Sequence, residues 1–165
     1  MSVHLRFAGL EDAELLISFR LALLEDGLAA DGALSETGRR ELAETLREYF
    51  RRHFEARDIV AVVAESGGRA VSSGMLTFAE IPPSQAYPNG QVASLYNMYT
   101  LKPWRRQGLA GAVLDKLLGE AARRGACAVN LAATADGEPL YLKFGFKFSG
   151  YRSMGLKLKL GSSDG

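Results

Sequence analysis

Two adjacent arginines and a glycine stand between a strand-like and a helix-like pattern in "YNMYTLKPWRRQGLAGAVL", residues 96–114. The strand pattern ends near Leu101 and the helical spacing begins at about Arg106. A strand-to-helix turn directs free backbone N–H groups at one point, and together with the helix dipole they attract a phosphate-like anion. Gly108 lets the anion approach the backbone without a Cβ in the way. Arg105 and Arg106 can add charge-assisted hydrogen bonds, so the segment predicts an anion site.

The loop differs from the two commonest phosphate-binding motifs. It lacks both the Gly-Lys-Ser/Thr of a P-loop and a G-x-G-x-x-G directly after a strand. Its own pattern is Arg105-x-x-Gly108-x-Ala110. Positive charge at a helix N-terminus opposes the dipole, and a bound anion would remove that conflict. The alternative is an ordinary solvated helix end.

This pattern resembles the pyrophosphate-binding motif of the GCN5-related N-acetyltransferases, Arg/Gln-x-x-Gly-x-Gly/Ala at a strand-to-helix turn. About thirty residues later, "LYLKFGF" (140–146) is similar to that family's "LYEKLGF" segment. The resemblance implies an acetyl-CoA-dependent acetyltransferase that uses no metal. Its acceptor would be a primary amine of a small molecule or peptide, which attacks directly in a ternary complex. Two alternatives remain open: a non-catalytic acyl-CoA-binding module, or an acyltransferase with another acyl-CoA or an oxygen acceptor.

The resemblance also implies where the donor binds. The strand end holds the pantetheine, and a backbone N–H near Met98 or Tyr99 polarises the acetyl carbonyl. The side chain of Arg105 and the backbone of residues 106–110 hold the pyrophosphate. The predicted donor-binding residues are Met98, Tyr99, Thr100, Arg105, Arg106, Gln107, Gly108, Leu109, Ala110, Thr134 and Phe144.

Tyr141 occupies the tyrosine position of the second motif, and we expect it to protonate the departing CoA thiolate. The alternative is a core tyrosine packed by its ring, because aromatic residues follow it closely. Two positions depart from the family's pattern. Pro103 stands one residue later than the usual proline, and Thr134 stands where many members carry an asparagine. Asn130, on the preceding strand, is the other candidate for that donor contact.

The general base is not assigned by the sequence. An alkyl ammonium has a pKa of about 10.4 and must lose a proton before it attacks. The strand segment "SLYNMYT" contains no carboxylate, and the nearest candidates are Glu80, Glu25 and Asp26. Each has the alternative of being a plain surface carboxylate.

The sequence does not identify the acceptor either. Segments 25–35 and 80–90 are expected to form the walls of its cleft, because loops at such positions usually carry specificity. The acidic residues Glu25, Asp26 and Asp31 are compatible with a cationic acceptor. Small amines, antibiotics, amino acids and protein N-termini all fit that description.

The elements that must position these residues are predicted in the order β-α-α-β-β-β-α-β-α-β-β. Gly67-Gly68 predicts a tight hairpin turn, and a helix is expected from Arg106 to Arg124. The strand-helix-strand step over 91–132 requires a parallel pair, and the resemblance implies that this central pair splays. A closing pair of strands is expected over 145–160. The fold class is therefore α/β (α+β): a mixed, mostly antiparallel sheet with helices on both faces.

The composition limits the remaining possibilities. We expect one domain over residues 1–160 and a flexible tail at 161–165, with a homodimer left open. The net charge of +1 argues against bulk binding to nucleic acid or to an anionic membrane. No apolar stretch is long enough to span a bilayer and no secretory leader is recognisable. The single cysteine, Cys127, allows no internal disulfide and is expected to be a buried strand thiol in a cytoplasmic protein.

Overall fold

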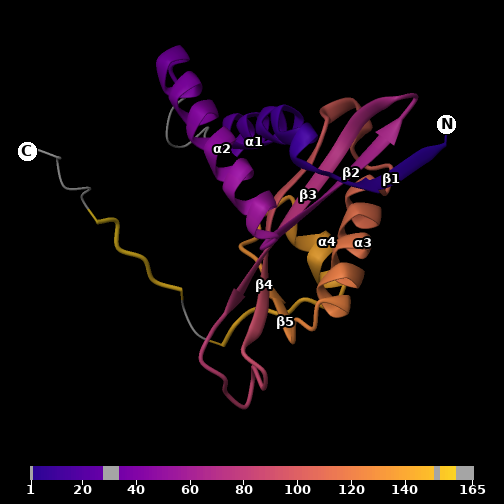
Figure 1. Ribbon diagram of the computed structural model, residues 1–165. Helices are drawn as coiled ribbons and strands as arrows, with labels where there is room; N and C mark the ends of the chain where they lie inside the picture. Colours follow the sequence, from indigo (N-terminus) through magenta and orange to yellow (C-terminus); the bar gives the residue numbers. More distant parts are fainter. Residues whose placement is uncertain (1, 28–33, 151–152, 159–165) are drawn as a thin grey trace, which may run out of the picture. The chain divides into compact units, whose positions relative to one another are not determined.

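The computed structural model describes residues 2–27, 34–150 and 153–158 (Figure 1). The chain divides into two compact units, residues 1–132 and 133–165. The single domain over 1–160 therefore stays a prediction, and the expected tail at 161–165 lies outside the described residues.

The first unit contains the sheet and three of the helices. In chain order its elements are β1 (Val3–Phe7), the 3-10 turn η1 (Leu10–Asp12), α1 (Ala13–Gly27), α2 (Glu36–Ala56), β2 (Ile59–Ser66), β3 (Arg69–Glu80), β4 (Gln91–Thr100), the 3-10 turn η3 (Lys102–Trp104), α3 (Leu109–Arg123) and β5 (Ala128–Asn130). The strands lie side by side in the order β1-β2-β3-β4-β5. Neighbours are antiparallel except β4 and β5, which are parallel. The mixed, mostly antiparallel sheet is thus confirmed.

Helices cover both faces of this sheet, as expected (Figure 1). Successive side chains of β2 point to opposite faces, because a strand has a period of two. One set packs with α1 and α2 in a core that contains Leu16, Ile17, Leu21, Phe50, Ile59, Ala61, Val63 and Met75. On the other face α3 supplies Val113, Leu114 and Leu117, all fully buried.

Local signals placed the turns correctly. Gly67 and Gly68 have φ angles of 58° and 75°, the positive values that a tight hairpin turn requires. Ser35 caps α2 by accepting a hydrogen bond from the backbone N–H of Gly38 at 3.0 Å. Helix α3 begins at Leu109, three residues later than expected, because Arg106 and Gly108 adopt left-handed backbone angles.

The second unit contains α4 (Glu138–Lys143), and Pro139 stands in its first turn, where the missing N–H of proline costs little. The closing pair of strands is wrong for the described part of that segment. Residues 146–150 and 153–158 form no strand, and 151–152 and 159–160 lie outside the described residues. The parallel pair therefore lies at the edge of the five-stranded sheet. Cys127 is also a correction, because it is exposed just before β5 rather than buried within a strand.

Candidate active site

A β-bulge shapes the end of β4. Ser73 pairs with Tyr99 and Met75 with Tyr96, so two residues of β4 oppose the single residue Gly74. Asn97, one of the two, has a φ of 56° and is buried. The bulge directs the Met98 side chain onto Gly74, in the space where a Cβ at that position would stand. A larger residue at Gly74 would displace Met98.

The same strand end has an open edge. Strand β4 pairs with β5 only over three residues, the last being Ser94 opposite Asn130. Residues 95–100 of β4 have no strand partner on that side among the described residues of the first unit. Backbone groups on such an edge are available to an extended ligand. The edge includes Met98, Tyr99 and Thr100, the three residues expected to contact pantetheine.

The loop after β4 presents a row of backbone donors. The first bond that enters α3 runs from the N–H of Ala112 to the carbonyl of Gly108 at 3.0 Å. Among the described residues, the backbone N–H groups of 106–111 donate no hydrogen bond within the protein. Gly108 has a φ of 81°, and no atom of the described residues lies within 4 Å of the place that a Cβ would occupy there. The predicted anion site is therefore open and positively polarised.

Leu109 and Gln107 contribute to this loop in different ways. Leu109 is buried in the core, so only its backbone faces the open side. The Gln107 side chain donates to the carbonyl of Pro103 at 3.2 Å, which closes the turn. Arg106 is exposed and Ala110 is half-buried.

Arg105 has partners that its motif does not reveal. Its guanidinium donates to Asp26 in α1 at 2.7 Å and to the carbonyl of Thr100 at 2.9 Å. It also lies over the ring of Tyr99, 5.4 Å from the ring centre. The role of its side chain as a pyrophosphate ligand stays a prediction.

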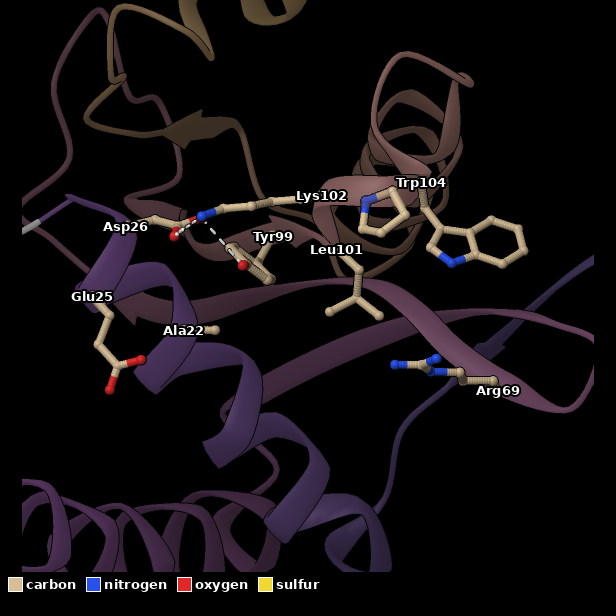
Figure 2. A pocket seen from close by; sticks show the side chains of 9 residues that line it. Ala22, Glu25, Asp26, Arg69, Tyr99, Leu101, Lys102 and Trp104 are labelled. Carbon is tan, nitrogen blue, oxygen red and sulfur yellow. Dashed lines mark hydrogen bonds and ion pairs between the residues drawn. The ribbon is translucent and has the colours of Figure 1, made fainter.

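A pocket of about 340 Å³ lies beside this cluster, between the end of α1 and the η3 turn (Figure 2). Its lining is mixed, with the apolar Ala22 and Leu101, the Trp104 indole and several charged groups. Glu25 is paired with Arg39, whereas Arg69 has no charged partner among the described residues. The described residues contain no group of three or more His, Cys, Asp or Glu that could hold a metal ion.

The sequence profile described as "Acetyltransferase (GNAT) family" matches residues 29–146 of this chain. The chain belongs to the GNAT acetyltransferase family. Residues 96–111, which form the open strand edge and the loop, lie within the matched region.

Solved structures of other acetyltransferases share the fold. A predicted acetyltransferase from Clostridium acetobutylicum, solved with acetyl-CoA, is 27% identical with a TM-score of 0.81, and the match covers 96% of each chain. A GCN5-related N-acetyltransferase from Ralstonia eutropha JMP134 is 22% identical with a TM-score of 0.82, over 94% of this chain and 99% of that one. A ribosomal-protein-alanine N-acetyltransferase from Brucella melitensis biovar Abortus 2308 is 18% identical with a TM-score of 0.68, over 96% and 100%. No curated protein matches the chain significantly.

The remaining predicted residues lie in the second unit of this GNAT chain. Thr134 closes the turn before α4, because its carbonyl accepts from the N–H groups of Gly137 and Glu138 at 3.0 and 2.9 Å. Phe144 ends that helix. The ring of Tyr141 packs edge-on against Phe146, with ring centres 5.8 Å apart.

The structure favours none of the three candidate general bases. Glu80 pairs with Gln91 at the far end of β4, seven residues and roughly 20 Å from Met98. Asp26 is held by two cations, and the hydrogen bonds from Lys102 and Arg105 lower the pKa of its carboxyl. Glu25 is paired with Arg39. Asp31, a candidate for binding the acceptor, lies outside the described residues.

Two features of the site were missed by sequence reasoning. The pairing of Asp26 with Lys102 and Arg105 joins positions far apart in the chain, and no local pattern signals it. The bulge had a signal, because a glycine inside a strand pattern, here Gly74, often marks a bulge or a close approach. The amide oxygen of Asn97 accepts from Arg20 of α1 at 3.0 Å, which ties the bulge to that helix.

No helix of the described residues is long and apolar enough to cross a membrane.

Proposed function

We propose that this chain transfers the acetyl group of acetyl-CoA to a primary amine of a small molecule or peptide, by direct attack in a ternary complex. The observation that carries the proposal is the row of backbone N–H groups at residues 106–111, which donate no hydrogen bond to any described residue and lie beside the open side of Gly108. Membership of the GNAT family and the acetyl-CoA in a structure 27% identical to this chain support the same donor.

The chain's own groups would bind acetyl-CoA and polarise its thioester. The loop N–H groups bind the pyrophosphate, since they lie at the positive end of α3. The open edge of β4 at Met98, Tyr99 and Thr100 hydrogen-bonds the pantetheine and orients the thioester. A backbone N–H near Met98 or Tyr99 stabilises the negative charge that develops on the carbonyl oxygen.

The chemical step is a single displacement. The neutral amine nitrogen attacks the carbonyl carbon, the bond from that carbon to sulfur breaks, and the CoA thiolate leaves with the electron pair. Tyr141 donates a proton to the thiolate, and its phenolate recovers a proton, through water, from the substituted nitrogen as that nitrogen becomes the amide. The described carboxylates near the loop are engaged by cations, so the proton of the incoming ammonium is most simply lost to water.

Substitution of Gly108 by valine tests the donor site. The branched side chain would occupy the open space over the loop, so acetyl-CoA should no longer raise the melting temperature, a shift that a ligand selective for the folded state produces. Gly125→Val is a matched control, because Gly125 has a φ of 80° and equally open surroundings at the other end of α3. Both variants carry the same backbone strain, and only the first should lose the donor.

The outcomes separate the competing functions. A Gly108→Val protein that folds and still binds acetyl-CoA like the parent would remove the loop from the donor site. Release of free CoA thiol, measured with a panel of amines, reports turnover. Binding without turnover across a broad panel would favour an acyl-CoA-binding module, and turnover only with alcohols would favour an oxygen acceptor.

A further inference from the structure

Asp26 lies in the last turn of α1, where three side chains from β4 and the following loop converge on its carboxylate. Lys102 contacts one oxygen at 3.0 Å. Arg105 contacts the other at 2.7 Å, and the hydroxyl of Tyr99 donates to that same oxygen at 3.2 Å. Figure 2 shows Lys102 and Tyr99 turned toward Asp26. The Asp26 carboxylate therefore binds two cations, Lys102 and Arg105, that stand just before the predicted pyrophosphate loop.

The position of Asp26 is unfavourable without those cations. The C-terminal end of a helix is the negative end of its dipole, and α1 has no basic residue in its last turn. A carboxylate at this end is repelled by the dipole. Lys102 and Arg105 offset that repulsion, and their hydrogen bonds keep the pKa of Asp26 below its usual range.

The groups that bind Asp26 are also suited to a phosphate. Ammonium and guanidinium groups give short charge-assisted hydrogen bonds to either anion. Arg105 stands three residues before Gly108, at the start of the motif. Side-chain exposures of 68% for Lys102 and 41% for Arg105 let both turn to a new partner without disturbing the core.

We propose that Asp26 is an internal competitor for the pyrophosphate of the donor. When acetyl-CoA binds, Arg105 and Lys102 exchange the Asp26 carboxylate for the pyrophosphate oxygens, and the end of α1 is released from the loop. This inference rests on the proposed function, because it needs a CoA donor at the loop of residues 105–110.

A purely structural role for Asp26 predicts the opposite result. If the carboxylate only fastens the loop to α1, its loss loosens the loop and weakens donor binding. If it competes with pyrophosphate, its loss frees two cations and strengthens donor binding. The sign of the change in affinity therefore decides between the two roles.

The test compares the parent with Asp26→Asn in calorimetric titrations with CoA and with pantetheine, which lacks the pyrophosphate. Asp26→Asn should bind CoA about three- to tenfold more tightly, the scale of two partly exposed ion pairs. Its melting temperature without ligand should fall, and its affinity for pantetheine should not change. Glu14→Gln is the matched control, because Glu14 is also on α1 and is bound by an arginine, Arg47. It should leave both affinities unchanged.

Each result bears on the inference. CoA affinity that is unchanged or weaker in Asp26→Asn overturns it, and so does an equal gain for pantetheine. Asp26→Glu, which retains the charge, should bind CoA as weakly as the parent. If Asp26→Asn does not fold, Asp26→Ser removes the same charge with a smaller side chain. A parent protein that fails to bind CoA would instead reject the proposed function, and the inference with it.

Discussion

The phenol of Tyr141 has the properties that a proton donor to a thiolate needs. Among the described residues its hydroxyl has no hydrogen-bond partner, while its ring is held against Phe146. Burial raises the pKa of this phenol, so it stays protonated at neutral pH. The ring packing alone would also suit a structural tyrosine. Removing only the hydroxyl separates the two roles.

We expect Tyr141→Phe to lower kcat by roughly 10²-fold or more, the scale of general acid catalysis. The melting temperature and the affinity for acetyl-CoA should change little, because the ring is retained. Tyr49→Phe is the control, since Tyr49 is a packed tyrosine on α2. Thiol-release kinetics on both variants measure the effect. A Tyr141→Phe enzyme with near-parental turnover would leave water as the proton source.

At the scale of residues, the sequence predicted what depends on neighbours in the chain. The open loop at Gly108 was predictable because the motif, the turn and the helix start are contiguous. The partners of Arg105 were not, because Asp26 lies 79 residues earlier in the sequence. A motif predicts the position of a side chain along the backbone, whereas tertiary packing determines which groups that side chain contacts.

At the scale of elements, the bulge in β4 depends on a glycine in the neighbouring strand. A Cβ at Gly74 would overlap the sulfur of Met98 and would approach Leu117 and Val113 at 3.0 Å each. The methionine can move, but the two residues of α3 are fully buried and have little freedom. The predicted donor edge at Met98 is thus coupled to the packing between β3 and α3.

We expect Gly74→Ala to lower the free energy of unfolding by about 1–3 kcal/mol, the usual cost of overpacking a core. Donor affinity should also fall, because Met98 is displaced. Gly119→Ala is the contrasting variant, because Gly119 is exposed on α3 and a Cβ there would have no atom of the described residues within 4 Å. It should stabilise the protein by up to about 1 kcal/mol through helix propensity. Urea unfolding and acetyl-CoA titration of both variants measure these effects, and a Gly74→Ala protein as stable as the parent would contradict the packing argument.

The elements themselves were predictable where their signals were local. The paired glycines at 67–68 determine a hairpin, and the apolar spacing after Gly108 determines α3. Strands were also expected over residues 145–160, where Leu156 and Leu158 alternate with lysines. A strand also needs a partner, however, and the described residues 153–158 pair with nothing. Alternation indicates only that a segment is able to form a strand. It does not show that a neighbouring strand is present to pair with it.

At the scale of the molecule, two networks of ion pairs lie at opposite ends of β2, one around Asp12 and one around Glu120. Asp12 is bound by Arg6 at 2.7 and 2.8 Å, and Arg6 also bonds Glu65 near the end of β2. Glu120 is bound by Arg123 and Arg124, and Arg124 donates to the carbonyl that precedes β2. The two networks are separated by the length of β2, roughly 20 Å or more. At that distance their contributions to stability should add.

Both networks should make the fold sensitive to acid. The hydrogen bonds from Arg6 lower the pKa of Asp12, and those from Arg123 and Arg124 lower the pKa of Glu120 to about 2. A carboxylate whose pKa is lower in the folded state stabilises the fold above its unfolded pKa of about 4, and this contribution is lost as the pH falls toward the folded value.

Asp12→Asn and Glu120→Gln should therefore each lower the free energy of unfolding at pH 7 by about 2 kcal/mol, the scale of hydrogen bonds to charged groups. The double variant should lose the sum, because the two networks share no residue. At pH 3 the parent has itself lost part of both contributions, so each difference should be smaller than at pH 7. Urea unfolding at the two pH values measures this, with the exposed Glu14→Gln as the control. Differences that stay constant between pH 7 and pH 3 would show that these carboxylates act through packing rather than through their charge.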